Sequence, residues 1–172
     1  MEASITLKSL AKKFNNDIIL ADLSLGIESY SNHAIIGQNG AGKSTILKIL
    51  IGLLEKDAGV AYINGKDIST RESETKMVTG YMPQYIDLDT EMTVFENLMV
   101  FGTLYGVSKE STTKRILKFS EIFDYKDRLL EYPTELPTGT LRTVQFTRAM
   151  IHNPEILLLD EPTNGMDPRN KT

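Results

Sequence analysis

The sequence predicts an α/β fold with a core of mostly parallel sheet, a small antiparallel β layer and an inserted helical subdomain at about residues 84–140. Three observations predict it. The apolar run 34–36 leads into the glycine-rich stretch 37–45 and then into a helical pattern, which is the strand–loop–helix order of an α/β unit. Residues 156–159 are apolar without interruption, as expected for a strand buried on both faces. Helix signals fill the segment between these two runs.

The small β layer is predicted by three early segments in which apolar and polar residues alternate with period 2. These segments are Ile5–Leu7, Leu23–Ile27 and Val60–Ile63. Asn64 and Gly65 follow the third, and this dipeptide favours a two-residue hairpin turn. We therefore expect the three segments to pair as antiparallel strands beside the core.

Residues 37–45 read Gly-Gln-Asn-Gly-Ala-Gly-Lys-Ser-Thr and satisfy the phosphate-loop pattern G-x-x-x-x-G-K-[ST] in full. Glycine lets the backbone curl so that successive N–H groups face phosphate oxygens. Lys43 supplies a mobile positive charge, and Ser44 offers a hydroxyl to the magnesium ion that accompanies a nucleotide. A helix predicted at 45–54 adds dipole attraction for phosphate. The stretch thus predicts a P-loop NTPase core, with these nucleotide-binding residues: Gly37, Asn39, Gly40, Ala41, Gly42, Lys43, Ser44 and Thr45.

Two carboxylates, Asp160 and Glu161, directly follow the apolar run 156–159. A carboxylate at the carboxyl end of a core strand, beside a phosphate loop, is where a magnesium-holding aspartate belongs. Glu161 lies one residue further on, where it is placed to polarise an attacking water. The pair therefore predicts a metal ligand at Asp160 and a catalytic group at Glu161.

The predicted helical region begins with a capping box at 93–96, which opens a helix through about Leu104. Ser108 opens a second helix, which is broken by Pro133. A third helix stops at Asn153, because a residue before proline avoids the helical region. The residues that share a face are Ile116, Phe119 and Phe123 in the second helix, and Leu141, Val144, Arg148 and Ile151 in the third.

The composition limits the classes of function. The net charge is −4 and no dense run of Lys and Arg occurs, so nothing favours nucleic-acid binding. The chain has no cysteine, which excludes disulfides and thiolate metal sites. Its most apolar stretches, 46–54 and 98–107, fall short of the ~20 residues that a membrane-spanning helix needs. We therefore expect any membrane connection to go through a partner.

Together these motifs resemble the ATP-binding domain of ATP-binding cassette (ABC) proteins, with 37–45 as Walker A and 156–161 as Walker B. The resemblance runs along essentially all of residues 1–172. Met82–Gln84 is similar to the family's Q-loop, which implies that Gln84 contributes to the shell around the metal and the water. Residues 162–168 are similar to the D-loop, in which Asp167 is the namesake residue.

The resemblance also implies roles for individual side chains. It makes Glu161, Gln84 and Lys43 catalytic, and it makes Ser44, Gln84 and Asp160 the magnesium ligands. Phe14 stands where the family places an aromatic ring against adenine, and a core aromatic near a strand end is an equal alternative.

The signature motif departs from the family pattern. Where the family has Leu-Ser-Gly-Gly-Gln, residues 136–140 read Leu-Pro-Thr-Gly-Thr. In the family this segment closes over the γ-phosphate bound by the opposite subunit. Pro137 lacks both a hydroxyl and an N–H, and Thr138 puts a side chain where glycine allows close approach. Only Gly139 remains of the three residues that face phosphate.

A second departure concerns the end of the sequence. The chain stops at Thr172, just after the D-loop, whereas the family continues to a switch histidine. His33 and His152 do not stand at that position, and both are interpreted as ordinary surface or boundary histidines. We therefore expect the ABC-type domain to be incomplete at its C-terminus.

The resemblance implies an ATP-binding subunit that, in the complete protein, hydrolyses ATP with Mg²⁺ and powers an ABC membrane transporter. Implied partners are a membrane-spanning subunit, which would hold the chain at the cytoplasmic face, and a second, non-identical cassette with an intact signature. A soluble ABC ATPase acting on nucleic acid or ribosomes and a non-hydrolysing nucleotide-binding module remain as alternatives. A P-loop kinase or small GTPase is disfavoured, because a helical insertion and a Q-loop separate Lys43 from Asp160.

Overall fold

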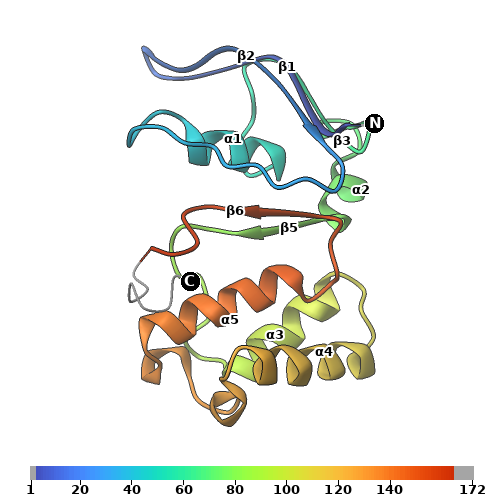
Figure 1. The fold of residues 1–172 in the computed structure, drawn as a ribbon, viewed down its shortest axis with the longest axis vertical. Helices are drawn as coiled ribbons and strands as arrows, with labels where there is room; N and C mark the ends of the chain where they lie inside the picture. Colours follow the sequence, from blue (N-terminus) through green and yellow to red (C-terminus); the bar gives the residue numbers. More distant parts are fainter. Residues whose placement is uncertain (1–2, 165–172) are drawn as a thin grey trace. The chain divides into compact units, whose positions relative to one another are not determined.

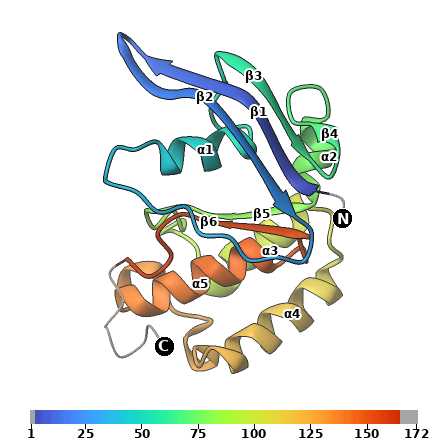
Figure 2. The ribbon, with the colours of Figure 1, turned by 45° about the horizontal axis from the view of Figure 1, so that its top comes forward.

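A computed structural model describes residues 3–164, which form a mixed α/β structure in two compact units (Figure 1). The described part of the first unit is 3–79, and that of the second is 80–164. The first unit contains β1 (Ala3–Phe14), β2 (Asp17–Glu28), α1 (Lys43–Leu50), β3 (Ala58–Ile63), β4 (Lys66–Asp67) and α2 (Glu72–Met77). Its four strands form an antiparallel sheet in the order β2-β1-β3-β4, and Figure 2 shows β1, β2 and β3 side by side.

The register of this sheet follows the apolar alternation of the sequence. Ile5 pairs with Ile63 and Leu7 pairs with Ala61, and all four side chains are buried. Asn64 and Gly65 both take left-handed φ angles, +48° and +73°, as a two-residue hairpin turn between β3 and β4 requires. The predicted antiparallel layer is therefore confirmed.

The strand predicted at 34–36 is wrong. No described strand pairs with these residues, which run as irregular chain, and Ile36 is 92% exposed. A strand exists only through hydrogen bonds to a neighbouring strand, so three apolar residues do not make one by themselves.

Helix α1 begins earlier and ends earlier than predicted. It stops at Leu50 because Gly52 adopts φ +71°, and the N–H groups of Gly52 and Leu53 donate to the carbonyls of Ile49 and Lys48. This is a Schellman motif, which satisfies carbonyls that the helix end leaves unpaired.

Strand β5 (Thr79–Met82), which lies in the second unit except for its first residue, pairs with β6 (Ile156–Leu159), and the two arrows run in the same direction (Figure 1). The helices of the second unit are α3 (Val94–Leu104), α4 (Lys109–Ile122) and α5 (Thr138–Met150), with short 3-10 turns at Lys126–Arg128 and Pro133–Glu135. Both ribbon views place α3 and α5 on the same side of the β5–β6 sheet (Figures 1 and 2). The predicted strand at 156–159 and the three predicted helices are thus confirmed, but α4 ends at Ile122, well before Pro133, and α5 ends at Met150, before Asn153.

Local signals set the starts of α3 and α4. The Thr93 hydroxyl accepts a hydrogen bond from the Glu96 N–H at 3.2 Å, and the Glu96 carboxylate accepts one from the Thr93 N–H at 2.8 Å, which completes the predicted capping box. Ser108 caps α4 in a similar way, by accepting from the Ser111 N–H. No helix within residues 3–164 combines the length and the apolar character that crossing a bilayer requires.

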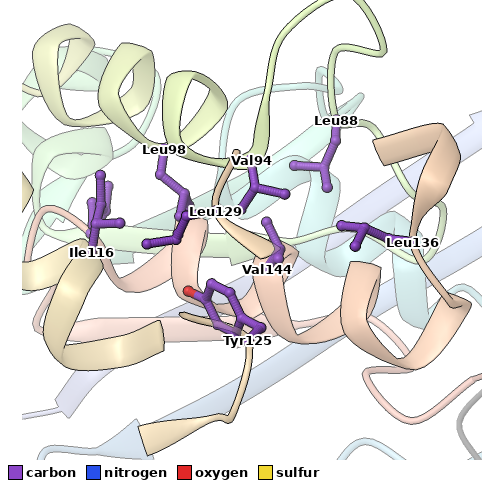
Figure 3. Close-up of a cluster of buried hydrophobic side chains, with 9 residues drawn as sticks. Leu88, Val94, Leu98, Ile116, Tyr125, Leu129, Leu136 and Val144 are labelled. Carbon is purple, nitrogen blue, oxygen red and sulfur yellow. The ribbon is translucent and has the colours of Figure 1, made fainter. Parts of the chain in front are cut away.

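The core of the second unit is an apolar cluster between α3, α4 and α5 (Figure 3). Its members are Leu88, Val94, Leu98, Ile116, Tyr125, Leu129, Leu136, Val144 and Ile151. Tyr125 is the one member with a polar group, and its hydroxyl donates a hydrogen bond to the Thr147 hydroxyl at 2.9 Å. Burial raises the pKa of Tyr125 to about 12.

Replacing Tyr125 by Phe should lower the free energy of unfolding by about 0.5–1.5 kcal/mol at neutral pH, because one buried hydrogen bond is lost. Thr147 still donates to the Thr143 carbonyl, which keeps the loss modest. The deficit should shrink as the pH rises from about 10 to about 12. A tyrosine in the unfolded chain ionises near pH 10, whereas folded Tyr125 keeps its proton up to about pH 12. Between these pH values ionisation favours the unfolded state of the parent, so the parent becomes less stable. The phenylalanine variant has no such group and does not lose this stability.

Urea unfolding of both proteins across this pH range measures the effect. Tyr85→Phe, unfolded over the same range, is the control, since its side chain is 75% exposed and the substitution should change the stability little. A stability gap between parent and Tyr125→Phe that stays constant up to about pH 12 would contradict the raised pKa.

Candidate functional site

The predicted site residues are divided between the two units, and each group is described by itself. Phe14 and residues 37–45 belong to the first unit. Gln84, Asp160 and Glu161 belong to the second. Asp167 lies outside the described residues.

The glycine-rich loop has the backbone conformations that its sequence predicts. Gly40 and Gly42 adopt φ +82° and +86°, in the left-handed region that favours glycine. Gly42 also has no room for a side chain, because a Cβ there would lie 2.9 Å from Leu20 Cδ2 and 3.0 Å from Ile19 Cγ2. The loop therefore needs glycine at 42 for both conformation and packing.

Lys43 folds back across the loop that precedes it. Its Nζ donates hydrogen bonds to the carbonyl oxygens of Gly37 at 2.9 Å and Gln38 at 2.8 Å. Lys43 is also the first residue of α1, and Ser44 and Thr45 follow in the first turn. No side chain caps this helix and its first turn has no acidic residue. A lysine ammonium and an uncapped helix N-terminus are both favourable surroundings for an anion such as phosphate.

Phe14 ends β1 and is 44% exposed, so the core alternative for this ring is wrong. The Nζ of Lys12 lies 5.4 Å from the centre of the ring. Lys12 also forms an ion pair with Asp57 at 2.9 Å, and its hydrogen bond is the main reason why the pKa of Asp57 is lowered. Phe14 therefore offers aromatic surface to a ligand, and its contact with adenine stays a prediction.

In the second unit the ends of β5 and β6 bring distant residues together. The Asp160 N–H donates to the Met82 carbonyl at 2.9 Å. Just beyond this bond, Gln84 Nε2 donates to Glu161 Oε2 at 2.8 Å, although 77 positions separate the two residues. The structure therefore joins the Q-loop glutamine to the glutamate predicted to act on water.

Glu161 occupies an unusual backbone position. Its φ is +48°, which costs free energy for a residue with a side chain and is common at functional sites. Asn164 closes a turn over it, because the Asn164 N–H donates to the Glu161 carbonyl at 3.0 Å. The Asn164 amide also donates to Glu161 Oε2 at 3.4 Å.

The two neighbouring carboxylates lie in opposite environments. Asp160 is only 4% exposed, whereas Glu161 is exposed. Burial, followed by the charge of Asp160, raises the pKa of Tyr81 to about 12. The oxygen donors of Asp160 and Gln84 are of the kind that Mg²⁺ prefers, and Mg²⁺ usually binds through one or two carboxylates together with substrate phosphates. The donor chemistry of the second unit thus fits the predicted metal.

The altered signature stretch has a buried part and an exposed part. Leu136 belongs to the apolar cluster. Pro137 is the N-cap of α5 and Thr138 its first residue, and both are exposed. A Cβ at Gly139 would meet no atom within 4 Å. The substitutions that distinguish this stretch are therefore at the surface.

Three polar residues of α5 were missed as a group by the sequence analysis. Arg142, Gln145 and Arg148 are buried, and all of them bond to the segment 83–87 that contains Gln84. Arg148 was predicted only to share a helix face with Leu141, Val144 and Ile151. The available signal was the spacing of polar residues at i, i+3 and i+6, which places them close together on a helix.

A family model and several curated proteins are similar to this chain over most of its length. A family model described as "ABC transporter" matches residues 20–164. The Nod factor export ATP-binding protein I of Burkholderia lata is 34% identical over 170 residues, a match covering 97% of this chain and 55% of that protein. The protein of the same name from Rhizobium sp. (strain N33) is 34% identical over 167 residues, with the same two shares covered. This chain thus spans about half the length of the curated relatives it matches.

A solved structure described as the ATP binding subunit of an ABC transporter has a TM-score of 0.87 and 29% identity to this chain. The match covers 95% of this chain and 68% of that one.

Replacing Gly42 by Ala should lower the free energy of unfolding by about 1–3 kcal/mol, because the new Cβ meets both an unfavourable φ and the side chains of Leu20 and Ile19. Urea unfolding measures the loss. Gly26→Ala is the matched control in the same unit, where a Cβ meets nothing within 4 Å, and it should change stability by no more than about 0.5 kcal/mol. Equal stabilities of the two variants would contradict the close packing at Gly42.

Proposed function

The chain belongs to the ABC transporter ATPase family, and from this premise we propose that it binds ATP and, in the complete protein, hydrolyses it to drive a membrane transporter. The geometry of the phosphate loop is the observation that carries the proposal. Gly40 and Gly42 adopt left-handed conformations, and Lys43 is held across the loop by two carbonyls. Such a loop presents backbone N–H groups and one cation to a triphosphate.

In this proposal the predicted site residues divide the work, and Ser44 and Gln84 each have two tasks. Phe14 stacks on adenine, and the loop residues Gly37 and Asn39–Thr45 hold the phosphates. Ser44, Gln84 and Asp160 would hold Mg²⁺, which would neutralise phosphate charge when bound. Glu161 accepts a hydrogen bond from the attacking water, and Gln84 keeps its carboxylate oriented through the 2.8 Å contact. Catalysis then consists of positioning and electrostatics.

The finer organisation of the fold belongs to the same proposal. We assign residues 84–140 as a helical subdomain within an ABC-type domain that spans 1–172. The pair β5–β6 would be part of a mostly parallel core sheet. Support comes from the uninterrupted apolar sequence of β6, which is typical of a strand covered on both faces.

The proposed partners follow from the family and from the altered signature. A membrane-spanning subunit would hold the chain at the cytoplasmic face of a membrane, and the relatives' names favour export as the direction of transport. Two copies of this chain alone would place Pro137 and Thr138 over each other's phosphate loops. We therefore propose that a non-identical cassette supplies an intact signature, which leaves one dominant catalytic site.

Replacing Lys43 by Ala should weaken Mg-ATP binding by about 10- to 150-fold, which corresponds to the ~1.5–3 kcal/mol of a charge-assisted contact. Equilibrium titration with Mg-ATP measures the change. Lys48→Ala is the control, because this exposed lysine lies on the same helix and outside the loop. Parent-like affinity of Lys43→Ala would contradict the proposed ATP site.

Replacing Glu161 by Gln in the complete protein should lower kcat by about 10²–10⁴-fold and leave ATP affinity nearly unchanged, because it removes a general base without touching the phosphate loop. Steady-state ATPase assays and a binding titration separate the two effects. ATP binding without hydrolysis in the parent itself would favour the non-hydrolysing module instead.

Replacing Pro137 by Ser together with Thr138 by Gly should raise ATPase activity by 10-fold or more where this chain is the only cassette present. Restored donors would face the partner's γ-phosphate, and loss of one such donor typically costs ~10²–10³ in rate. Thr134→Ser, at a nearby exposed position, is the control. A fast parent that the double substitution does not accelerate would rule out an impaired signature.

A further inference from the structure

Arg142 is a buried cation without a carboxylate partner among the described residues. Only 6% of the residue is exposed. Its Nε donates to the Asn164 carbonyl at 3.1 Å, its Nη1 donates to the Pro83 carbonyl at 3.3 Å, and its Nη2 donates to the Gln84 carbonyl. A buried charge is costly unless its hydrogen bonds are made. Backbone carbonyls of two separate segments, 83–84 and 164, thus satisfy the guanidinium together with Gln145 Oε1, which accepts from Nη1 at 3.4 Å.

These two segments carry the residues proposed to act on water. Gln84 belongs to the first, and Glu161 begins the turn that Asn164 closes. The Gln84–Glu161 contact therefore lies between two backbone segments that one guanidinium bonds to simultaneously. We propose that Arg142 is a positioning residue that holds the two segments together so that Gln84 and Glu161 meet. The catalytic part of this inference rests on the proposed function.

Arg142 differs in this respect from its neighbours on α5. Gln145 donates to the Tyr85 carbonyl at 2.6 Å and to Asp87 Oδ1 at 2.9 Å. Arg148 pairs with Asp87 and stacks over the ring of Phe101 at 4.2 Å. Both side chains therefore bond to the segment 83–87, and within the described residues neither bonds to Asn164. Of these three side chains, Arg142 is the one that bonds to both segments.

The chemistry of the side chain suits this task. Guanidinium presents five N–H donors in a rigid planar fork, so one group reaches carbonyls in several directions. Lysine has a single ammonium at the end of a flexible chain and cannot reproduce that geometry. Bonding the carbonyls of Gln84 and Asn164 at the same time therefore requires the shape of the guanidinium as well as its positive charge.

Amide hydrogen exchange tests the positioning without any dependence on catalysis. Arg142→Gln and Arg142→Lys should each speed exchange of the Asn164 N–H by about 10-fold or more, because the turn over Glu161 loses its anchor. The Asp160 N–H, which bonds to the Met82 carbonyl, should keep its protection. Arg115→Gln is the matched control, since Arg115 donates to the Ile151 carbonyl at 2.6 Å and bonds to neither segment.

Steady-state kinetics of the complete protein tests the consequence for the reaction. Both Arg142 variants should lower kcat by about 10- to 100-fold with KM for ATP changed by less than about 3-fold, because misplacement affects the chemical step and the phosphate loop is untouched. In a Gln84→Ala background, Arg142→Gln should lower kcat by no more than a further ~3-fold, since it acts through the same contact. Arg115→Gln should leave kcat near the parent value.

Several outcomes would overturn the inference. Unchanged exchange at Asn164 removes the positioning role, and so does a parent-like kcat in Arg142→Lys. Full additivity with Gln84→Ala shows that Arg142 does not act through this pair. If the parent complete protein does not hydrolyse ATP, the proposed hydrolysis fails, and the exchange data alone decide the positioning role. Arg142→Lys, which keeps the charge, carries both measurements if Arg142→Gln does not fold.

Discussion

The arrangement of the second unit depends on polar side chains buried on helix α5. Arg142, Gln145 and Arg148 each donate to backbone carbonyls of the segment 83–87. Because an unsatisfied buried polar group is costly, any displacement of this segment would leave several donors without partners. The path of the chain after β5 is thereby set by the helix, and Gln84 is brought to Glu161 as a consequence.

The phosphate loop follows a different principle, since its parts are neighbours in the sequence. Left-handed glycines turn the chain, Lys43 closes the turn on the carbonyls of Gly37 and Gln38, and α1 begins at the same lysine. The hydrogen bonds of Lys43 thus join residues no more than six positions apart. The residues after β5 and β6, by contrast, are ordered by contacts between segments far apart in the sequence.

In the altered signature stretch, one residue contributes to the core and the substituted residues lie at the surface. Leu136 packs in the apolar cluster, and this contribution to the core is independent of the residues that follow it. Pro137 and Thr138 begin α5 at the surface, where they add little to packing. Sequence change at these two positions therefore has a low cost for folding. Such a change would instead affect binding to a partner that contacts the start of α5.

By itself, the sequence determined those features whose causes are local. The capping box of α3, the Asn64-Gly65 turn and the glycine loop before α1 all depend on residues within a few positions of one another. The apolar run 156–159 was also recognisable in the sequence, although the strand itself forms by pairing with β5.

Tertiary structure decided the rest. It left 34–36 without a strand partner, exposed Phe14, and joined Gln84 to Glu161 across 77 positions. It also gave the buried Arg142 its carbonyl partners on two segments. No local pattern encodes such pairings, because they arise only when separate segments are packed together and each buried polar group must find a partner.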